Sequence, residues 1–336
     1  MDLTNPPITV VEKSTQGKTM LWYGDNRTGK TANAVKMPRP FAVAFENGLN
    51  AIAGLPFWQP TKWKEAKDIL KEFKRPEVKA MYDTILLDTL EKAGRMLIKY
   101  ICARHGVDKI GDANNGFGAY SEVEQEWDDF ITALANEGYT VVIIAHETMQ
   151  MPVDAETGKK YERIVPKGDK RVVSSTCDLV DIIGYCMSNG FDEEGNEQMS
   201  SIYFKDAKHF KAGSRWTSIT KSVVFNVPNV TEAIVNAITA QEVIDGSEHY
   251  TDKKVIAAPE VKKTFEEIVD EIKVQGGVLK EKTGSFALFT EMVEAKLGEG
   301  EKVSGCTVKH REILEELLDE MIEKAEALDK IQEETK

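Results

Sequence analysis

The stretch of sequence that decides the fold is MLWYGDNRTGKTANAV, from Met20 to Val35. Its central part matches the pattern G-x-x-x-x-G-K-[ST] of a phosphate-binding loop, or P-loop. An apolar run leads into this loop and a helical stretch leads out of it, which is the strand, loop and helix order that the motif requires. The residues expected to bind nucleotide are Gly24, Asp25, Asn26, Arg27, Thr28, Gly29, Lys30 and Thr31.

The chemistry of such a loop predicts ATP and Mg²⁺ as ligands. Its backbone N–H groups are expected to surround the β-phosphate at the positive end of the following helix. Lys30 is expected to reach the β- and γ-phosphates, and the Thr31 hydroxyl to ligate Mg²⁺. An ordinary turn that contains glycine is the alternative interpretation of the same residues.

Outward from the P-loop, short apolar runs alternate with amphipathic stretches, which is typical of an α/β domain with a mainly parallel sheet. The predicted strands are Met20–Tyr23, Phe41–Phe45, Thr84–Leu87 and Thr140–Ala145. The predicted helices are Lys30–Lys36, Lys62–Phe73, Leu90–Arg104 and Tyr120–Asn136. We therefore expect buried parallel strands joined by crossover helices.

Three polar residues follow the ends of these strands. Asp88 ends the strand at Thr84–Leu87, and an acid in that place beside a P-loop holds magnesium, usually through water. Glu46 follows the strand after the P-loop helix, where a carboxylate could orient and deprotonate the water that attacks the γ-phosphate; an N-cap or a surface acid is the alternative. His146 ends a central strand and faces the ligand crevice, so it is either a sensor of the γ-phosphate or a structural histidine.

The character of the sequence changes after Ala145. Residues 147–175 are polar, contain glycine and lack a period, so we expect a long loop, which in a compact domain is usually functional or mobile. A hairpin that pairs Ile182–Met187 with Ser200–Phe204 is expected to follow.

A boundary is predicted near Val227–Thr231, because strand-like sequence ends there and charged helical sequence begins. This divides the chain into a core, residues 1–230, and an acidic, mainly helical region, residues 231–336. Helices of that region are expected over Phe265–Val274, Phe286–Leu297 and about Lys309–Ile331. The apolar stripe of the last helix must pack on something. It belongs either to a small helical subdomain or flexible tail, or to an arm that binds a partner or mimics DNA.

Composition excludes several classes of protein. A chain of 336 residues with 41% hydrophobic and 29% charged residues is large enough to bury a core and is not a disordered chain. No apolar run approaches the roughly 18 residues that cross a bilayer, and no secretory signal opens the sequence, so we expect a cytoplasmic protein that does not bind membranes. The four cysteines form no CxxC pair and no zinc spacing, so we expect reduced thiols.

The net charge of −13 is unevenly distributed. Residues 231–336 contain 25 Asp and Glu against 14 Lys and Arg, which leaves residues 1–230 nearly neutral. A locally basic strip between Met199 and Lys221 survives in this acidic chain. Because the local field decides whether a polyanion binds, the total charge does not exclude nucleic acid.

Taken in order, these parts resemble the phage-encoded RecA-like ATPases, a family that includes the Sak-type single-strand annealing recombinases. The order is the P-loop, a strand closing in Glu46-Asn47-Gly48, Trp63 on a helix, the strand before Asp88, the segment Gly116-Phe117-Gly118-Ala119-Tyr120, and the strand before His146. The resemblance spans roughly Lys18 to Arg215. It implies a RecA-like P-loop NTPase with a mainly parallel central sheet flanked by helices, to which the acidic helical region is an appendage without counterpart.

The resemblance also implies roles for particular residues. Glu46 corresponds to the catalytic glutamate and His146 to the polar sensor of RecA-like proteins. Two mobile loops of that core contact single-stranded DNA, and they correspond to Asp112–Tyr120 and Met149–Thr176. The candidate DNA-binding residues in these loops are Phe117, Tyr120, Lys159, Lys160, Arg163, Lys167, Lys170 and Arg171. Phe117 or Tyr120 could stack a base, a contact worth on the order of 1–3 kcal/mol.

Two departures from the family pattern affect the site. The family tends to carry Ala-Lys-x-Arg in the strand after the second loop, which supplies cations to the neighbouring subunit's γ-phosphate. Here Ala207 and Lys208 are present, but Phe210 stands in place of the arginine, so Lys208 and Lys211 are the candidates for that contact. In the P-loop, Asn26-Arg27 replaces the usual small residues.

The sequence therefore predicts an ATPase, expected to be DNA-dependent, that acts on single-stranded DNA in phage recombination or annealing. The family implies a homo-oligomer with ATP at the subunit interface, and a single-strand DNA-binding protein as a partner. A ring, a filament and a monomer all stay open. Two other functions remain: a nucleotide-gated adaptor such as a helicase loader, and a P-loop kinase of a small substrate. The kinase would need an arginine-bearing lid, whereas the loop after His146 bears mainly lysine.

Overall fold

A computed structural model describes residues 6, 8–253 and 264–334. The chain divides into two compact units, Met1–Ala257 and Ala258–Lys336. The first unit is an α/β domain and the second is helical, in agreement with the classes predicted for the two parts.

The first unit is built on a sheet whose hydrogen-bonded strand order is β11-β9-β8-β2-β6-β5-β3-β4, with β10 paired to β8 and β7 paired to β6. The strands are β2 (Thr19–Gly24), β3 (Pro40–Ala44), β4 (Phe57–Trp58), β5 (Thr84–Asp88), β6 (Thr140–Gln150), β7 (Arg163–Pro166), β8 (Ile182–Met187), β9 (Ser201–Tyr203), β10 (Gly213–Ser214) and β11 (Ser222–Val224). All pairs from β8 through β4 along this order are parallel, and the pairs formed by β7, β9, β10 and β11 are antiparallel. A separate parallel pair joins β1 (Val11–Glu12) to β12 (Tyr250–Thr251).

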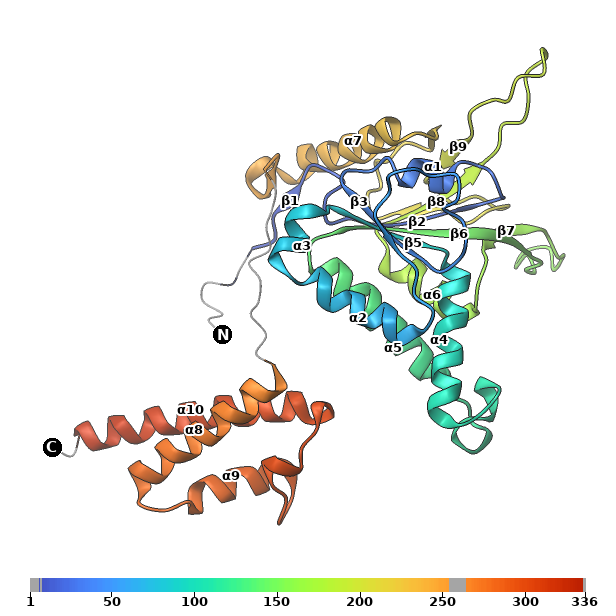
Figure 1. Cartoon of the computed structure of the whole chain (residues 1–336). Helices are drawn as coiled ribbons and strands as arrows, with labels where there is room; N and C mark the ends of the chain where they lie inside the picture. The colour runs from blue at the N-terminus through green and yellow to red at the C-terminus, as the bar shows by residue number, and fades with distance from the viewer. Residues whose placement is uncertain (1–5, 7, 254–263, 335–336) are drawn as a thin grey trace. The chain divides into compact units, whose positions relative to one another are not determined.

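Helices cover both faces of the sheet (Figure 1). The helices of this unit are α1 (Lys30–Ala34), α2 (Trp63–Phe73), α3 (Pro76–Met81), α4 (Leu90–His105), α5 (Tyr120–Asn136), α6 (Lys170–Leu179) and α7 (Val227–Asp245). In Figure 1, α2, α4, α5 and α6 lie on one side of the sheet, and α1 and α7 lie on the other.

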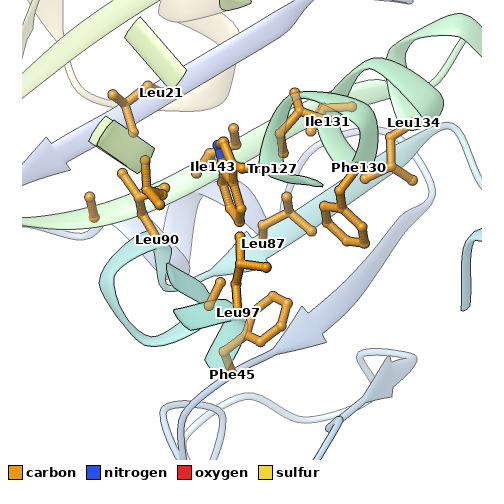
Figure 2. Packing of buried hydrophobic residues seen from close by; sticks show 14 of the residues in the cluster. Leu21, Phe45, Leu87, Leu90, Leu97, Trp127, Phe130, Ile131, Leu134 and Ile143 are labelled. Carbon is orange, nitrogen blue, oxygen red and sulfur yellow. The ribbon is translucent and has the colours of Figure 1, made fainter. Parts of the chain in front are cut away.

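The two-residue period of the strands divides the core between these faces. Along β2, Leu21 and Tyr23 belong to the cluster under α2, α4, α5 and α6, whereas Met20 and Trp22 belong to the cluster under α1 and α7. Figure 2 shows the first cluster, in which Trp127 and its neighbours on α5 pack against side chains of the sheet. Because both faces are buried, these strands are apolar throughout, which is what made them visible in the sequence.

The structure corrects the prediction of a long loop over residues 147–175. Strand β6 continues to Gln150 and pairs with β7, with Met149 opposite Ile164, so that residues 147–166 form a two-stranded arm. Helix α6 then begins at Lys170, capped by the Asp169 side chain. The period was missed because the arm leaves the sheet: none of residues 147–150 is buried, and in β7 burial is limited to Val165 and Pro166, which is too short a stretch to show an apolar pattern.

Helix α7 belongs to the first unit, so the division at Ala257 lies later than the boundary expected after residue 230. Its buried residues, including Val230, Ile234 and Ile238, complete the second core cluster. The Asn226 side chain caps the helix, and the proline at its start marks a helix N-terminus rather than the end of a domain.

The second unit contains three helices in its described part: α8 (Phe265–Thr283), α9 (Ala287–Leu297) and α10 (Arg311–Glu334). The apolar stripe of α10 packs against α8 and α9, with Leu314, Leu317 and Met321 fully buried. Gly276 lets α9 approach α8 closely, because a Cβ there would lie 2.8 Å from the Phe289 ring. The stripe is thus the core of a small helical subdomain, one of the two alternatives that the sequence left open.

Within the described residues, no helix has the length and apolar character needed to cross a bilayer.

Candidate active site

The P-loop connects β2 to α1 and is held closed by its own lysine. Lys30 is only 5% exposed, and its Nζ donates hydrogen bonds to the carbonyl oxygens of Gly24 (3.0 Å) and Asp25 (2.6 Å). Burial lowers the pKa of Lys30. A buried ammonium whose partners are two carbonyl oxygens and the Thr28 hydroxyl (3.3 Å) is well placed to bind an anion, because an anion satisfies it better than neutral dipoles do.

Two glycines permit the shape of this loop. Gly24 ends β2 opposite Cys186 of β8, and a Cβ at Gly24 would collide with the Cys186 carbonyl group. Gly29 precedes α1 with φ of 80°, a conformation that residues with a side chain rarely adopt.

Arg27 of the same loop also has a positive φ, of 65°, and its side chain is exposed. Helix α1 is only five residues long, so the loop's backbone N–H groups matter more here than any helix dipole.

The predicted metal ligands lie together. The Thr31 hydroxyl donates a hydrogen bond of 2.9 Å to Asp88 Oδ2, although β6 lies between β2 and β5 in the sheet. Asp88 is 4% exposed, and burial raises its pKa to about 6, against the lowering effect of the Thr31 hydrogen bond. Burial therefore outweighs the Thr31 hydrogen bond and the favourable charges of His146 and Lys30.

These two residues fit a magnesium ion bound together with a nucleotide. In the described residues, no group of three or more His, Cys, Asp or Glu side chains could hold a metal alone. Magnesium normally takes one or two protein oxygens and completes its shell with water and phosphate oxygens. Thr31 and Asp88 supply those protein oxygens. The raised pKa of Asp88 shows that burial destabilises its ionised form, and a bound cation would stabilise that form.

Pairing of β3 with β5 brings Glu46 close to the predicted metal ligand Asp88. Ala44 is the register partner of Asp88, and the Phe45 N–H donates to the Asp88 carbonyl oxygen at 2.6 Å. Glu46 is the next residue and stays partly exposed, with Lys92 Nζ at 3.8 Å from its Oε2. A partly hydrated carboxylate beside the metal ligands is suited to bind and deprotonate a water molecule.

His146 lies within β6, at the point where its parallel pairing with β2 ends, in register with Gly24 of the P-loop. Its Nδ1 is 2.5 Å from Oε1 of Glu91, which is buried in the first turn of α4. This hydrogen bond raises the pKa of His146. Burial alone would raise the pKa of Glu91, but the hydrogen bond to His146, backbone hydrogen bonds and the charge of His146 together outweigh burial, so the pKa of Glu91 is lowered. Glu91 thus orients the His146 ring through Nδ1 and favours its protonated form.

A pocket of about 270 Å³ joins these groups at the carboxyl ends of β2, β3, β5 and β6. This edge of a parallel sheet is where α/β proteins bind ligands. The residues that line the pocket are Asp25, Asn26, Glu46, Glu91, Lys92, Arg95, His146, Glu147 and Lys167. The P-loop, the predicted base and the predicted sensor therefore meet in one cavity.

Four of these residues were missed from the sequence: Glu91, Lys92, Arg95 and Glu147. A signal was present, because α4 begins two residues after Asp88 and its first turns must start at the ligand edge of the sheet. Helix periodicity then puts Lys92 and Arg95 on one face.

A family model described as "AAA domain" matches residues 16–216. The chain belongs to this AAA-domain family. It is also 35% identical over 326 residues to the SPbeta prophage-derived uncharacterized protein YorG of Bacillus subtilis (strain 168), which covers 96% of this chain and 98% of that protein. Among solved structures, it resembles the RadB recombinase with a TM-score of 0.32 and 12% identity, over 56% of this chain and 80% of that one.

Membership of the AAA-domain family makes this an α/β P-loop NTPase fold, with a mainly parallel central sheet flanked by helices, and implies nucleotide binding. The matched region ends before α7, which packs on the AAA domain as part of the same unit.

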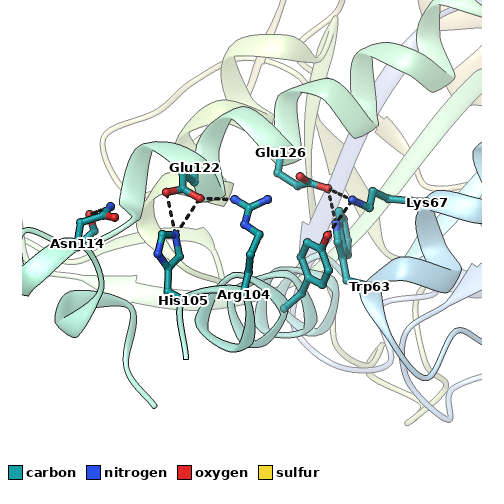
Figure 3. Close-up of polar contacts among 9 residues, drawn as sticks. Trp63, Lys67, Arg104, His105, Asn114, Glu122 and Glu126 are labelled. Carbon is teal, nitrogen blue, oxygen red and sulfur yellow. Dashed lines mark hydrogen bonds and ion pairs between the residues drawn. The ribbon is translucent and has the colours of Figure 1, made fainter. Parts of the chain in front are cut away.

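The first candidate DNA loop, Asp112–Tyr120, covers the second half of the connection between α4 and α5 and the first residue of α5. Figure 3 shows how the two ends of this connection are joined: Glu122 at the start of α5 accepts hydrogen bonds from Arg104 and His105 at the end of α4. Phe117, near the end of this loop, is 88% exposed. Its ring is therefore available to stack on a base.

Tyr120 is less available than Phe117. The Arg171 guanidinium lies 3.8 Å from the centre of its ring, and a Cβ added to Gly118 would lie 2.6 Å from the ring edge. Arg171 and Tyr120 thus partner each other and fasten α6 to the start of α5.

The second candidate DNA loop, Met149–Thr176, spans most of the arm and the first part of α6, and its cations are in different surroundings. Arg163 forms an ion pair with Asp206 at 2.7 Å, and Lys167 lines the nucleotide-side pocket. Lys159, Lys160 and Lys170 are exposed, and none has an ion-pair partner within the described part of the chain. These three remain the most accessible cations of the predicted set.

The segment after β9 lies along the arm. Lys208 forms an exposed ion pair with Asp154 at 2.7 Å. The Lys211 backbone N–H donates a hydrogen bond to the hydroxyl of Tyr23, a buried residue. Phe210, at the position where an arginine was expected, stacks on Tyr185 with ring centres 4.8 Å apart. An aromatic core contact therefore occupies that position in place of a cation.

Proposed function

We propose that this protein is a RecA-like ATPase that acts on single-stranded DNA in phage recombination or annealing. The observation that carries the ATPase part is that Asp25 and Asn26 of the P-loop share one pocket with Glu46 and His146, while the Thr31 hydroxyl donates a hydrogen bond to Asp88. A P-loop lysine, a magnesium-ligand pair and a carboxylate base are the parts that phosphoryl transfer to water requires.

In the proposed reaction, a water oxygen forms a bond to the γ-phosphorus while the bond from that phosphorus to the β,γ-bridging oxygen breaks. The electron pair of the broken bond leaves on ADP, and Glu46 accepts a proton from the water. Lys30 neutralises the β- and γ-phosphate oxygens after giving up its bonds to the loop carbonyls. Thr31 and Asp88 would hold Mg²⁺, which would supply further neutralisation of the phosphate charge.

The DNA part of the proposal rests on two surfaces of the AAA domain. Phe117 offers an exposed ring for base stacking, and Lys159, Lys160 and Lys170 offer unpaired cations for phosphates. Stacking platforms combined with basic tracks are the usual means of binding single strands without sequence preference.

The partners belong to the same proposal. A homo-oligomer would place ATP between subunits, where Lys208 could reach a neighbour's nucleotide, since an exposed ion pair such as Lys208–Asp154 costs little to break. The likeness to a prophage-derived protein supports a phage role, with a single-strand DNA-binding protein as a further partner.

The test is ATP hydrolysis by the full chain with Mg²⁺, measured with and without single-stranded DNA. The proposal expects turnover that DNA stimulates, and its loss in Lys30→Ala by at least about 10²-fold, because a preorganised transition-state cation is removed. Lys99→Ala, an exposed lysine of α4 that does not line the pocket, is the matched control and should keep full activity.

Other outcomes identify the other functions. Hydrolysis that is indifferent to DNA would favour a nucleotide-gated adaptor. Stimulation by a small acceptor would favour a kinase. Equal turnover by wild type and Lys30→Ala would show that the P-loop assignment is wrong.

A further inference from the structure

Three cations surround the pocket beside the P-loop: Lys92 and Arg95 from α4, and Lys167 from the connection between β7 and α6. We propose that they form a same-chain cation cluster that binds the terminal phosphate of the nucleotide. The cluster takes the place of the arginine that a neighbouring subunit would otherwise supply. This inference rests on the proposed ATPase function and identifies further residues of that site.

The position of α4 is what brings two of these cations to the phosphates. The helix starts at Leu90, directly after the strand that ends in Asp88, so its first turns lie at the ligand edge of the sheet. Lys92 and Arg95 are three residues apart, which puts them on the same face of the helix. The distance of 3.8 Å from Lys92 Nζ to Glu46 Oε2 places that amine beside the predicted base.

Lys167 reaches the same pocket from the base of the arm. Its backbone N–H donates to the His146 carbonyl oxygen at 2.8 Å, which fixes the main chain of Lys167 next to the predicted sensor. The side chain is exposed. Neither Lys167 nor Arg95 has a side-chain hydrogen bond or ion pair within the described ranges, 6, 8–253 and 264–334. Both side chains are thus free to turn toward an anion.

The charge of the pocket requires such cations. Glu91 is paired with His146, but Asp25, Glu46 and Glu147 also line the pocket and would repel a phosphate. Lys92, Arg95 and Lys167 offset these three carboxylates, and His146 is paired with Glu91, so that the charge of Lys30 is left to act on a phosphate. Cations that only make a surface soluble would not be expected to cluster, from two elements, around the cavity that also contains the proposed general base.

The position of Phe210 supports the view that the cations for the terminal phosphate come from the same chain as the P-loop. Its ring stacks on Tyr185 and lies 5.2 Å from the Tyr203 ring, so this position is part of the core and presents no cation to a neighbour. The pocket cations need no neighbouring subunit to reach their place.

The first experiment measures ATP turnover and the affinities of the full chain for ATP and ADP, in wild type, Arg95→Ala and the triple variant Lys92→Ala/Arg95→Ala/Lys167→Ala. We expect kcat to fall about 10²-fold in Arg95→Ala. We expect the triple variant to lose on the order of tenfold or more of its preference for ATP over ADP, with ADP affinity unchanged. Lys99→Ala is the control on the same helix. Unchanged ADP affinity also shows that the variants fold.

The second experiment mixes two inactive variants. Lys30→Ala chains keep the cation cluster, and Arg95→Ala chains keep the P-loop. If the arginine acted on a neighbour's nucleotide, mixed assemblies would regain turnover, whereas a same-chain cluster predicts none. Lys30→Ala mixed with Lys208→Ala is the parallel comparison for a contact between subunits.

The outcomes separate the two proposals. Absence of hydrolysis by the wild type would remove the ATPase function, and the ATP-to-ADP affinity ratio would still test the cluster. Normal hydrolysis with an unchanged ratio and turnover in the triple variant would overturn the cluster alone. Recovery of turnover on mixing would overturn its same-chain character.

Discussion

At the scale of single residues, the buried carboxylate of Asp88 destabilises the fold until a cation reaches it. Burial raises its pKa from an unfolded value near 3.8 to about 6. Between these values the folded chain binds more protons than the unfolded chain, so the contribution of Asp88 to stability falls as pH rises through that window. Above about pH 6 the penalty is complete, and below about pH 4 it is absent.

Asp88→Asn is therefore expected to stabilise the magnesium-free protein while weakening magnesium-dependent ATP binding. The Asn oxygen can still accept the Thr31 hydrogen bond, and the gain is on the order of 2 kcal/mol at pH 7.5. Chemical denaturation in EDTA at pH 7.5 and pH 5 measures it, with a smaller gain at pH 5. A variant less stable than wild type at pH 7.5 would contradict this account of Asp88.

At the scale of elements, the arm (residues 147–166) is a hairpin extension whose strand β7 is also bonded to residues 206–211. Its tip is a turn in which the Asp154 N–H donates a hydrogen bond of 2.9 Å to the Lys159 carbonyl oxygen. Val153, which pairs with Lys160 next to this turn, is exposed. Figure 1 shows β7 running beyond the body of the sheet. Because the tip contributes nothing to the core, its charges can be changed with little effect on stability.

Lys159→Ala/Lys160→Ala should therefore leave ATP hydrolysis without DNA intact and weaken binding to single-stranded DNA. Loss of two phosphate contacts lowers the slope of log affinity against log salt by about 1.4. Fluorescence anisotropy with labelled oligonucleotides from low to high salt measures this slope. Lys64→Ala/Lys99→Ala removes two exposed lysines of α2 and α4 and is the charge-matched control. Equal slopes for the two double variants would remove the arm tip from the DNA surface.

At the scale of the whole molecule, the two units have separate cores. Leu317 is fully buried in the cluster formed by α8, α9 and α10, whereas Leu97 is fully buried in the cluster beneath the sheet. No residue belongs to both of these clusters. Unfolding of the two units is therefore expected to be separable.

Leu317→Ala should destabilise the helical unit by about 2–5 kcal/mol, because it leaves a cavity in a small core. All five tryptophans lie in residues 1–257, so tryptophan fluorescence reports on the first unit and far-ultraviolet circular dichroism reports on both. In urea, the variant should shift a dichroism transition and leave the fluorescence transition in place. Leu97→Ala should do the reverse. A fluorescence transition that moves with Leu317→Ala would show that the units unfold together.

Much of the fold and part of the site could be predicted from the sequence. The strand before Lys30, the strand that ends in Asp88 and helix Tyr120–Asn136 were predicted because burial on both faces or on one stripe leaves a clear apolar pattern. The arm lacked such a pattern and was predicted as a loop. The end of the first unit was placed before α7, since a proline and a change of charge resemble a boundary whether or not the next helix packs on the core.

The sequence by itself determined the P-loop, its flanking strand and helix, and the acids and histidine that end the neighbouring strands. These features are local, because residue spacing along the chain fixes loop shape and strand period. Only the tertiary structure decided that Lys92, Arg95 and Lys167 share a pocket with Glu46, and that Phe210 belongs to the core. Such relations depend on strand order and on the rotation of each helix over the sheet, which no short stretch of sequence encodes.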